Sequence, residues 1–221
     1  MADYPVMLQL RGRRCLVIGA GPVGQRKLQS LVPTGAELIL VAPEADRLDL
    51  PPEVSIINRV FRETDLDGAT LVFAATDSSL VNTQIADAAR KRKIPVNIAD
   101  DPQSSDFTLP AVSRQGALVV AVGTTGQSPA AAVLARDALE DYLGTGWAIF
   151  VQIAAKLRQL ALTTDSKSLY NQRVLQILLE KGLIRMLESG DRTGIEQLFA
   201  SQFAGKVTLD DLEICLPKGL S

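Results

Sequence analysis

The sequence predicts an α/β fold, built on a doubly wound parallel sheet and followed by a small α+β region and a helical C-terminal region. A glycine-rich turn near the start lies between a short apolar run and an amphipathic segment, the pattern of strand, turn and helix. Short apolar runs then alternate with helical segments as far as residue 98, and no run of strand length follows residue 147. Strands that alternate with helices form parallel sheets covered by helices on both faces.

The first unit of this pattern contains the most informative motif. An apolar strand over residues 15–18 leads into Gly19, Gly21 and Gly24, which have the G-x-G-x-x-G spacing, and a helix and a second strand over 38–41 follow. In such a turn the first glycine allows the tight bend, the second lets backbone approach a pyrophosphate, and the third lets the helix pack against the strand. The motif therefore predicts a Rossmann-like domain that binds a dinucleotide at a helix N-terminus, with a turn that holds no ligand as the alternative.

Three more strands are expected in this sheet, over residues 54–60, 69–75 and 94–98. The helix before the last of them has an N-cap at Asp77 or Ser78 and runs to about Arg92. Its expected apolar face comprises Leu80, Ile85, Ala88 and Ala89. The basic residues at its C-terminal end complement the helix dipole, and a binding patch for an anionic substrate is the alternative.

The pattern changes after residue 109. Residues 110–113 and 117–122 are predicted to be two strands joined by a turn at 114–116. A helix is expected from Ser128, as N-cap, to Leu143, and Gly144 ends it. From Trp147 onward the apolar residues recur at helical intervals, so the rest of the chain is expected to be helical.

Composition excludes several classes of catalytic machinery. The chain has 221 residues and no histidine, so Ser-His-Asp and Cys-His catalysis are excluded. No Cys-x-x-Cys pair exists to begin a zinc site, and no metal site is assigned. Cys15 lies inside the first predicted strand and is expected to be a buried, reduced thiol, far in sequence from Cys215.

Charge and hydropathy point to a cytoplasmic protein. The net charge of −2 gives no global case for binding nucleic acid or a membrane surface. No apolar run approaches the length of a membrane span. The first residues lack a basic segment followed by an apolar one, so no signal peptide is expected.

A second group of polar residues follows the last strand of the sheet. Asp100 and Asp101 lie in the stretch 97–102, at the edge where the carboxyl ends of parallel strands meet. Carboxylates near the nicotinamide half of a bound cofactor are well placed to handle protons. An Asp-Asp-Pro sequence is equally typical of an ordinary turn, and spacing alone leaves the two interpretations open.

Six sequence blocks in order resemble the precorrin-2 dehydrogenase family, the NAD-dependent module of siroheme synthesis. The blocks are Leu8–Lys27, Val41–Glu44, Ala74–Asp77, Val96–Pro102, Asp106–Pro110 and Gly126–Ala130. The resemblance is close over residues 5–143 and thin over the helical region that follows.

The resemblance implies the oxidation of precorrin-2 to sirohydrochlorin, with a hydride passing to NAD⁺. It carries the functional aspartate of the family onto Asp100, whereas Asp101 remains a structural turn residue. It also implies a homodimer in which residues 113–145 exchange elements between protomers. The expected domains are an NAD-binding Rossmann domain over 1–112, a dimerisation region over 113–146 and a helical C-terminal domain over 147–221.

The candidate site residues follow from these motifs. Those assigned to the cofactor lie at strand ends and in the glycine turn: Gly19, Gly21, Pro22, Val23, Gly24, Pro43, Glu44, Thr76 and Asp77. Those assigned to the carboxylates of the tetrapyrrole are basic or hydroxyl residues, each also typical of a solvated surface: Arg14, Arg26, Lys27, Arg114, Thr124 and Ser128.

Glu44 lies slightly beyond the place where NAD-binding folds usually hold the ribose 2′-OH with an acidic residue, and Arg47 is close. We favour NAD over NADP on this pattern.

Two other functions stay open. A bifunctional enzyme would also insert Fe²⁺ into sirohydrochlorin, as some members of the family do. A regulatory module would bind NAD without turnover and would not need Asp100.

Overall fold

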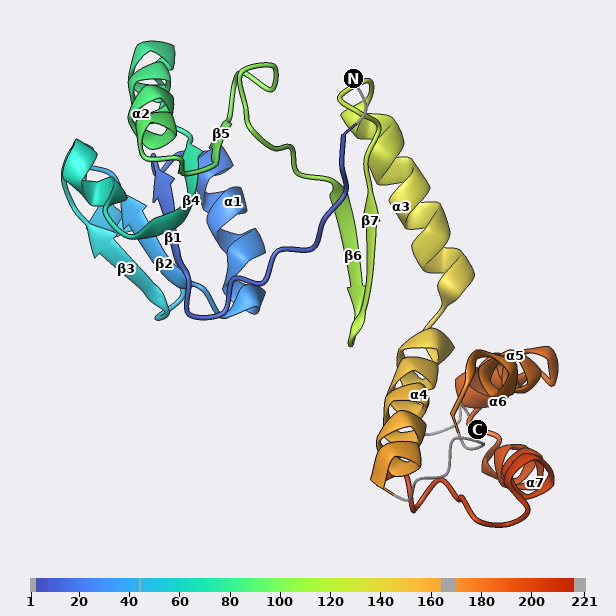
Figure 1. The fold of residues 1–221 in the computed structure, drawn as a ribbon. Helices are drawn as coiled ribbons and strands as arrows, with labels where there is room; N and C mark the ends of the chain where they lie inside the picture. Colours follow the sequence, from blue (N-terminus) through green and yellow to red (C-terminus); the bar gives the residue numbers. More distant parts are fainter. Residues whose placement is uncertain (1–2, 44, 164–169, 217–221) are drawn as a thin grey trace. The chain divides into compact units, whose positions relative to one another are not determined.

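The computed structural model describes residues 3–43, 45–163 and 170–216 (Figure 1). The chain divides into two compact units, one ending at Leu109 and the other beginning at Pro110. Hydrophobic core clusters lie on both faces of the sheet in the first unit, and a separate core lies among the helices of the second.

The first unit is a five-stranded parallel sheet in the order β3-β2-β1-β4-β5. Its strands are β1 (Arg14–Ile18), β2 (Glu37–Val41), β3 (Val54–Ile57), β4 (Ala69–Ala74) and β5 (Val96–Ile98). The order reverses between β1 and β4, because the chain first builds outward to β3 and then returns to the other side of β1. In doubly wound sheets the ligand binds at such a switch point, outside the carboxyl ends of the strands.

Helices cover both faces of this sheet, as its strands require. Leu16 and Ile18 of β1 pack in one core with α2 (Ser79–Lys91), whereas Cys15 and Val17 pack in another with α1 (Pro22–Leu31). Successive side chains of a strand point to opposite faces, so a central strand of a covered sheet is apolar throughout. The prediction of a doubly wound parallel sheet is confirmed.

Several predicted boundaries in this unit were wrong by a few residues. β3 ends at Ile57 rather than at residue 60, because the chain turns there and the Arg59 amide donates to the Ile57 carbonyl at 2.9 Å. β5 begins at Val96 rather than at 94. Leu80 is 69% exposed, so it does not share the buried face of α2 with Ile85 and its neighbours.

The second unit begins with an antiparallel hairpin and continues as helices. β6 (Ala111–Gln115) pairs with β7 (Leu118–Val122), and α3 follows. The predicted turn at 114–116 was wrong, since Arg114 and Gln115 belong to β6 and the turn is at Gly116 and Ala117. The helices are α3 (Pro129–Leu143), α4 (Gly146–Thr163), α5 (Gln172–Glu180), α6 (Leu183–Ser189) and α7 (Arg192–Phe203).

The predicted start and end of α3 are confirmed. The Ser128 hydroxyl accepts from the Ala131 amide at 3.2 Å, Pro129 is the first helical residue, and Gly144 is the C-cap. Helices α4 to α7 enclose a separate core, whose fully buried members include Ile153, Leu157, Leu178, Leu183 and Phe199. None of the helices in the described parts of the chain is long and apolar enough to cross a membrane.

The two thiols are expected to react differently. Cys15 is fully buried, and burial raises the pKa of its thiol to about 11, whereas Cys215 is exposed. Since the thiolate is the reactive form, we expect an aromatic disulfide reagent at about pH 8 to titrate Cys215 in the folded protein and both thiols after denaturation. Rapid labelling of both thiols in the folded protein would contradict the burial of Cys15 in β1.

Candidate functional site

The glycine turn closes the carboxyl end of β1 against the end of β4. Gly19 has a φ of +111°, and a Cβ there would lie 2.2 Å from the Ala75 carbonyl oxygen and 2.7 Å from the Thr76 nitrogen. A Cβ at Gly24 would lie 2.1 Å from the carbonyl oxygen of Gly19. Both glycines are therefore required by the protein's own backbone, because no larger residue fits without movement.

Gly21 has a different environment. It is the N-cap of α1, with an ordinary extended conformation (φ −68°, ψ 174°), and no atom lies within 4 Å of a Cβ built on it. Among the described residues no side chain caps this helix start. The space outside Gly21 and the free N–H groups of the first turn of α1 fit an approaching pyrophosphate.

A buried amide connects the end of β4 with the loop after β5. The side-chain oxygen of Asn82, on α2, accepts from the Thr76 amide at 3.0 Å and from the Thr76 hydroxyl at 2.7 Å. Its nitrogen donates to the Thr76 carbonyl at 3.2 Å and to Oδ1 of Asp100 at 3.0 Å. Asn82 is only 1% exposed, whereas Asp100 is exposed. Residues of α2 and of the segments that follow β4 and β5 thus form one network beside the glycine turn.

A second buried amide joins α1 to β5. Nζ of Lys27 donates to Oδ1 of Asn97 at 2.7 Å and lies 5.5 Å from the centroid of the Phe73 ring. The Asn97 side-chain nitrogen donates to the Phe107 carbonyl at 2.9 Å. Burial, and then the charge of Arg26, lower the pKa of Lys27. The Lys27 ammonium is therefore held by Asn97 in this structure, and its assignment to the substrate stays a prediction.

Asp101 and its neighbours form an ordered turn. The Ser104 amide donates to the Asp101 carboxylate at 3.1 Å, and hydrogen bonds from Ser104 lower the pKa of Asp101. The Ser105 hydroxyl accepts from the Ile98 amide at 2.8 Å and donates to the Asp101 carbonyl at 2.9 Å. These contacts support the interpretation of Asp101 as a turn residue.

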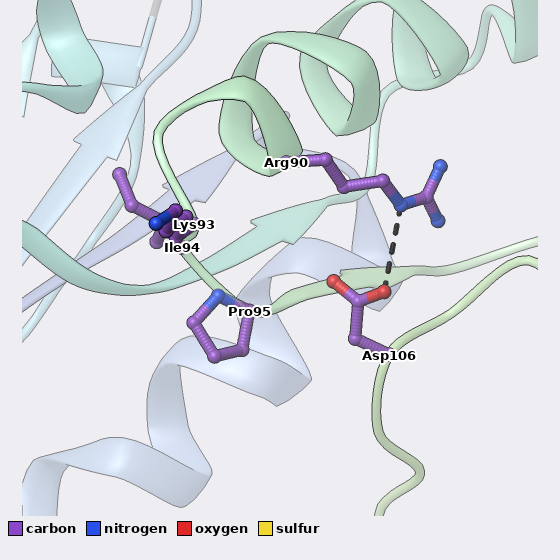
Figure 2. A pocket seen from close by; sticks show the side chains of 5 residues that line it. All are labelled: Arg90, Lys93, Ile94, Pro95 and Asp106. Carbon is purple, nitrogen blue, oxygen red and sulfur yellow. Dashed lines mark hydrogen bonds and ion pairs between the residues drawn. The ribbon is translucent and has the colours of Figure 1, made fainter.

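The two arginines at the end of α2, Arg90 and Arg92, are paired with carboxylates. Figure 2 shows Arg90 directed at Asp106, with Nε 3.4 Å from the carboxylate oxygen, beside Lys93 and Pro95. Arg92 lies 3.3 Å from Glu63 and 3.7 Å from Asp67. The pocket that Arg90, Lys93, Pro95 and Asp106 line lies before the start of β5, at the opposite end from the carboxyl edge of the sheet. The pairing favours a structural role for these two arginines over an anion-binding patch.

The structure places the other predicted residues as follows. Pro22 and Val23 are exposed at the start of α1, Pro43 is exposed after β2, and Asp77 is exposed after β4. Glu44 lies outside the described residues. Arg14 and Arg26 belong to the first unit, whereas Arg114, Thr124 and Ser128 belong to the second. The six substrate candidates are thus divided between the two units.

Sequence reasoning missed Asn82 and Asn97. Asn82 lies three residues before Ile85 and four before Ala86, both buried in the core under α2. An asparagine on the apolar face of an amphipathic helix is a signal that could have identified it, because buried polar groups need partners. Within the described residues, no group of three or more His, Cys, Asp or Glu side chains could hold a metal ion.

Comparisons with known proteins agree with this fold. Residues 6–111 match a family model described as putative NAD(P)-binding. The chain is 37% identical over 162 residues to a siroheme synthase from Methylococcus capsulatus, covering 71% of this chain and 34% of that protein. It is 29% identical over 210 residues to a siroheme synthase from Methylobacillus flagellatus, covering 91% of this chain and 45% of that protein. The chain therefore spans less than half the length of these relatives.

A solved structure has the same fold along nearly the whole chain. The structure of SirC, a precorrin-2 dehydrogenase, superposes with a TM-score of 0.64, covering 96% of this chain and 99% of that one. The two sequences are 22% identical over this match, so the likeness concerns the fold.

Proposed function

Because the chain belongs to the precorrin-2 dehydrogenase family, we propose that it oxidises precorrin-2 to sirohydrochlorin, with NAD⁺ as the hydride acceptor. The observation that carries this proposal is the arrangement at the switch point of the sheet. There the glycine turn lies against Thr76, and the Thr76–Asn82 network reaches Asp100. A dinucleotide cradle and a carboxylate are the two parts that this oxidation needs from the protein.

We assign the cofactor to the carboxyl edge of the sheet. Gly21 leaves room for the pyrophosphate, and the first N–H groups of α1 are oriented to bind it. Pro43 and Thr76, which follow β2 and β4, lie along the same edge. When bound, the nicotinamide supplies the hydride acceptor. We keep the preference for NAD over NADP, which the match to an NAD(P)-binding model leaves open.

Asp100 is proposed to accept the proton. Oxidation of the macrocycle removes one hydride and one proton, so a base is needed beside the hydride acceptor. The chain has no histidine, and a carboxylate that follows β5 is the natural alternative. Asp100 is exposed and held by Asn82, so it is accessible to a bound substrate and oriented.

The proposal is tested by mixing the purified chain with precorrin-2 and NAD⁺ under anaerobic conditions. We expect NADH and the absorbance spectrum of sirohydrochlorin to appear together. Binding of NAD⁺ without turnover would favour the regulatory alternative. A parallel reaction with sirohydrochlorin and Fe²⁺ tests the bifunctional alternative, which predicts catalysed formation of siroheme.

We also propose that the chain forms a homodimer through residues 113–145. In the second unit, α3 buries only Ala132 and exposes a set of large apolar side chains. These are Val133, Leu134, Leu139 and Tyr142. An exposed apolar helix of this kind is typical of an interaction surface.

Substituting Leu134 with glutamate is expected to convert the dimer to a monomer. Light scattering at micromolar concentration should give twice the 23.7 kDa chain mass for the wild type and the chain mass for Leu134→Glu. Leu80→Glu is the matched control, because Leu80 is 69% exposed and Leu134 is 70% exposed, but Leu80 lies on α2. A monomeric wild type would refute the proposed dimer.

A further inference from the structure

We infer that Asn82 is a positioning residue for the oxidation: its side-chain amide, fixed by Thr76, holds the Asp100 carboxylate in place by a direct hydrogen bond. The inference rests on the proposed function, because it assumes that Asp100 is the proton acceptor. It gives a role in the site to Asn82, a buried residue of α2 that belongs neither to the glycine turn nor to a strand end.

The orientation of the Asn82 amide follows from its partners. The Thr76 amide can only donate, so the side-chain atom that faces it at 3.0 Å is the oxygen. The other end of the amide is then the nitrogen, which donates to the Thr76 carbonyl and to the acceptor-only carboxylate of Asp100. Every contact pairs a donor with an acceptor. The contacts with Thr76 thus determine that the amide nitrogen, and not the oxygen, faces Asp100.

The two ends of the amide serve different purposes. The Thr76 end satisfies backbone groups at the end of β4, which is a structural role. The Asp100 end is not required for that role, because Asp100 is exposed and water could solvate its carboxylate. Among the described residues, only Asn82 donates a side-chain hydrogen bond to this carboxylate. A hydrogen bond that restricts a base to one side-chain rotamer improves its alignment with the substrate.

Asn82 also relates the proposed base to the cofactor cradle. Thr76, which fixes the amide, lies directly against Gly19, where a Cβ would come within 2.7 Å of its nitrogen. Within the first unit, the glycine turn therefore lies against Thr76, Thr76 bonds to Asn82, and Asn82 bonds to Asp100. Through them the carboxylate keeps a constant place relative to the turn that is proposed to hold the dinucleotide.

The test separates the two ends of the amide. Asn82→Asp keeps an oxygen that accepts from Thr76 and places a second carboxylate oxygen against Asp100, so the positioning bond is lost. We expect kcat to fall by about tenfold to a hundredfold, while the NAD⁺ affinity stays near that of the wild type. The melting temperature should also fall, because the buried carboxylate faces the Thr76 carbonyl oxygen as well as Asp100 and can donate to neither. Thr83→Asp is the matched control, since it adds the same charge to the next residue of α2 at an exposed position. It should keep the wild-type kcat.

A double-mutant cycle distinguishes positioning from a general structural effect. If Asn82 acts through Asp100, Asn82→Asp should slow the wild type but leave the residual rate of Asp100→Asn unchanged. Losses that add in the double variant would overturn the inference, and so would an unchanged kcat in Asn82→Asp alone. If Asn82→Asp does not fold, Asn82→Ser, which is too short to reach Asp100, replaces it in the same cycle.

The outcomes also separate this inference from the proposed function. A wild-type chain that binds NAD⁺ but does not oxidise precorrin-2 refutes the proposed function and the inference with it. A wild-type chain that turns over, together with an Asn82→Asp variant of normal kcat, refutes the inference alone.

Discussion

Replacing Asp100 with asparagine is expected to lower kcat by about two to four orders of magnitude and to leave NAD⁺ affinity unchanged. The amide has nearly the same shape as the carboxylate, and its oxygen can still accept the hydrogen bond from Asn82, which is 3.0 Å long in the wild type. The substitution therefore preserves the position of the side chain and removes only its ability to take a proton. Stopped-flow absorbance with precorrin-2 and calorimetry with NAD⁺ measure the two quantities separately.

Asp101→Asn is the matched control for this experiment. Asp101 is the next residue, and its carboxylate accepts from the Ser104 amide within the turn, which an asparagine oxygen can also do. We expect this variant to keep normal turnover and stability. Near-normal turnover in Asp100→Asn would contradict the role of Asp100 as the base and leave both aspartates as turn residues.

Local patterns predicted the sheet and the glycine turn because each depends on residues close in sequence. The apolar strand at 15–18, the spacing of Gly19 and Gly24, and the N-cap at Ser78 need no knowledge of distant contacts. The parallel direction of the strands also followed, since strands that alternate with helices form parallel sheets. Boundaries were less accurate where a turn decides them, as at Ile57 and at the hairpin.

The network at the site could not be derived in this way. Asn82 and Asp100 are 18 residues apart, and Lys27 and Asn97 are 70 residues apart. Both pairs meet only because α1 and α2 pack against strands whose order brings the ends of β4 and β5 together. The sequence could identify Asp100 as a candidate base, but the amide that orients it depends on this packing.

The three glycines of the turn differ in what they do, and substitutions should show it. At Gly19 and Gly24 the protein's own backbone occupies the space that a Cβ would need, so a side chain at either position should destabilise the fold. Gly21 has open space around it and an ordinary backbone conformation, so a side chain there fits the folded protein. A valine is a poorer N-cap than glycine, which costs about 1 kcal/mol at the start of α1, against a typical domain stability of about 5–15 kcal/mol.

Gly21→Val is therefore expected to abolish measurable NAD⁺ binding in calorimetry while the far-ultraviolet circular dichroism and cooperative thermal unfolding persist. The branched side chain would occupy the space that the pyrophosphate needs at the N-terminus of α1, where nothing of the protein now lies within 4 Å. Gly24→Val is the contrasting variant, because its Cβ would lie 2.1 Å from the Gly19 carbonyl oxygen and it should lose stability as well as binding. Unchanged NAD⁺ affinity in Gly21→Val would move the cofactor away from this turn, since a ligand seated there cannot share its space with the valine.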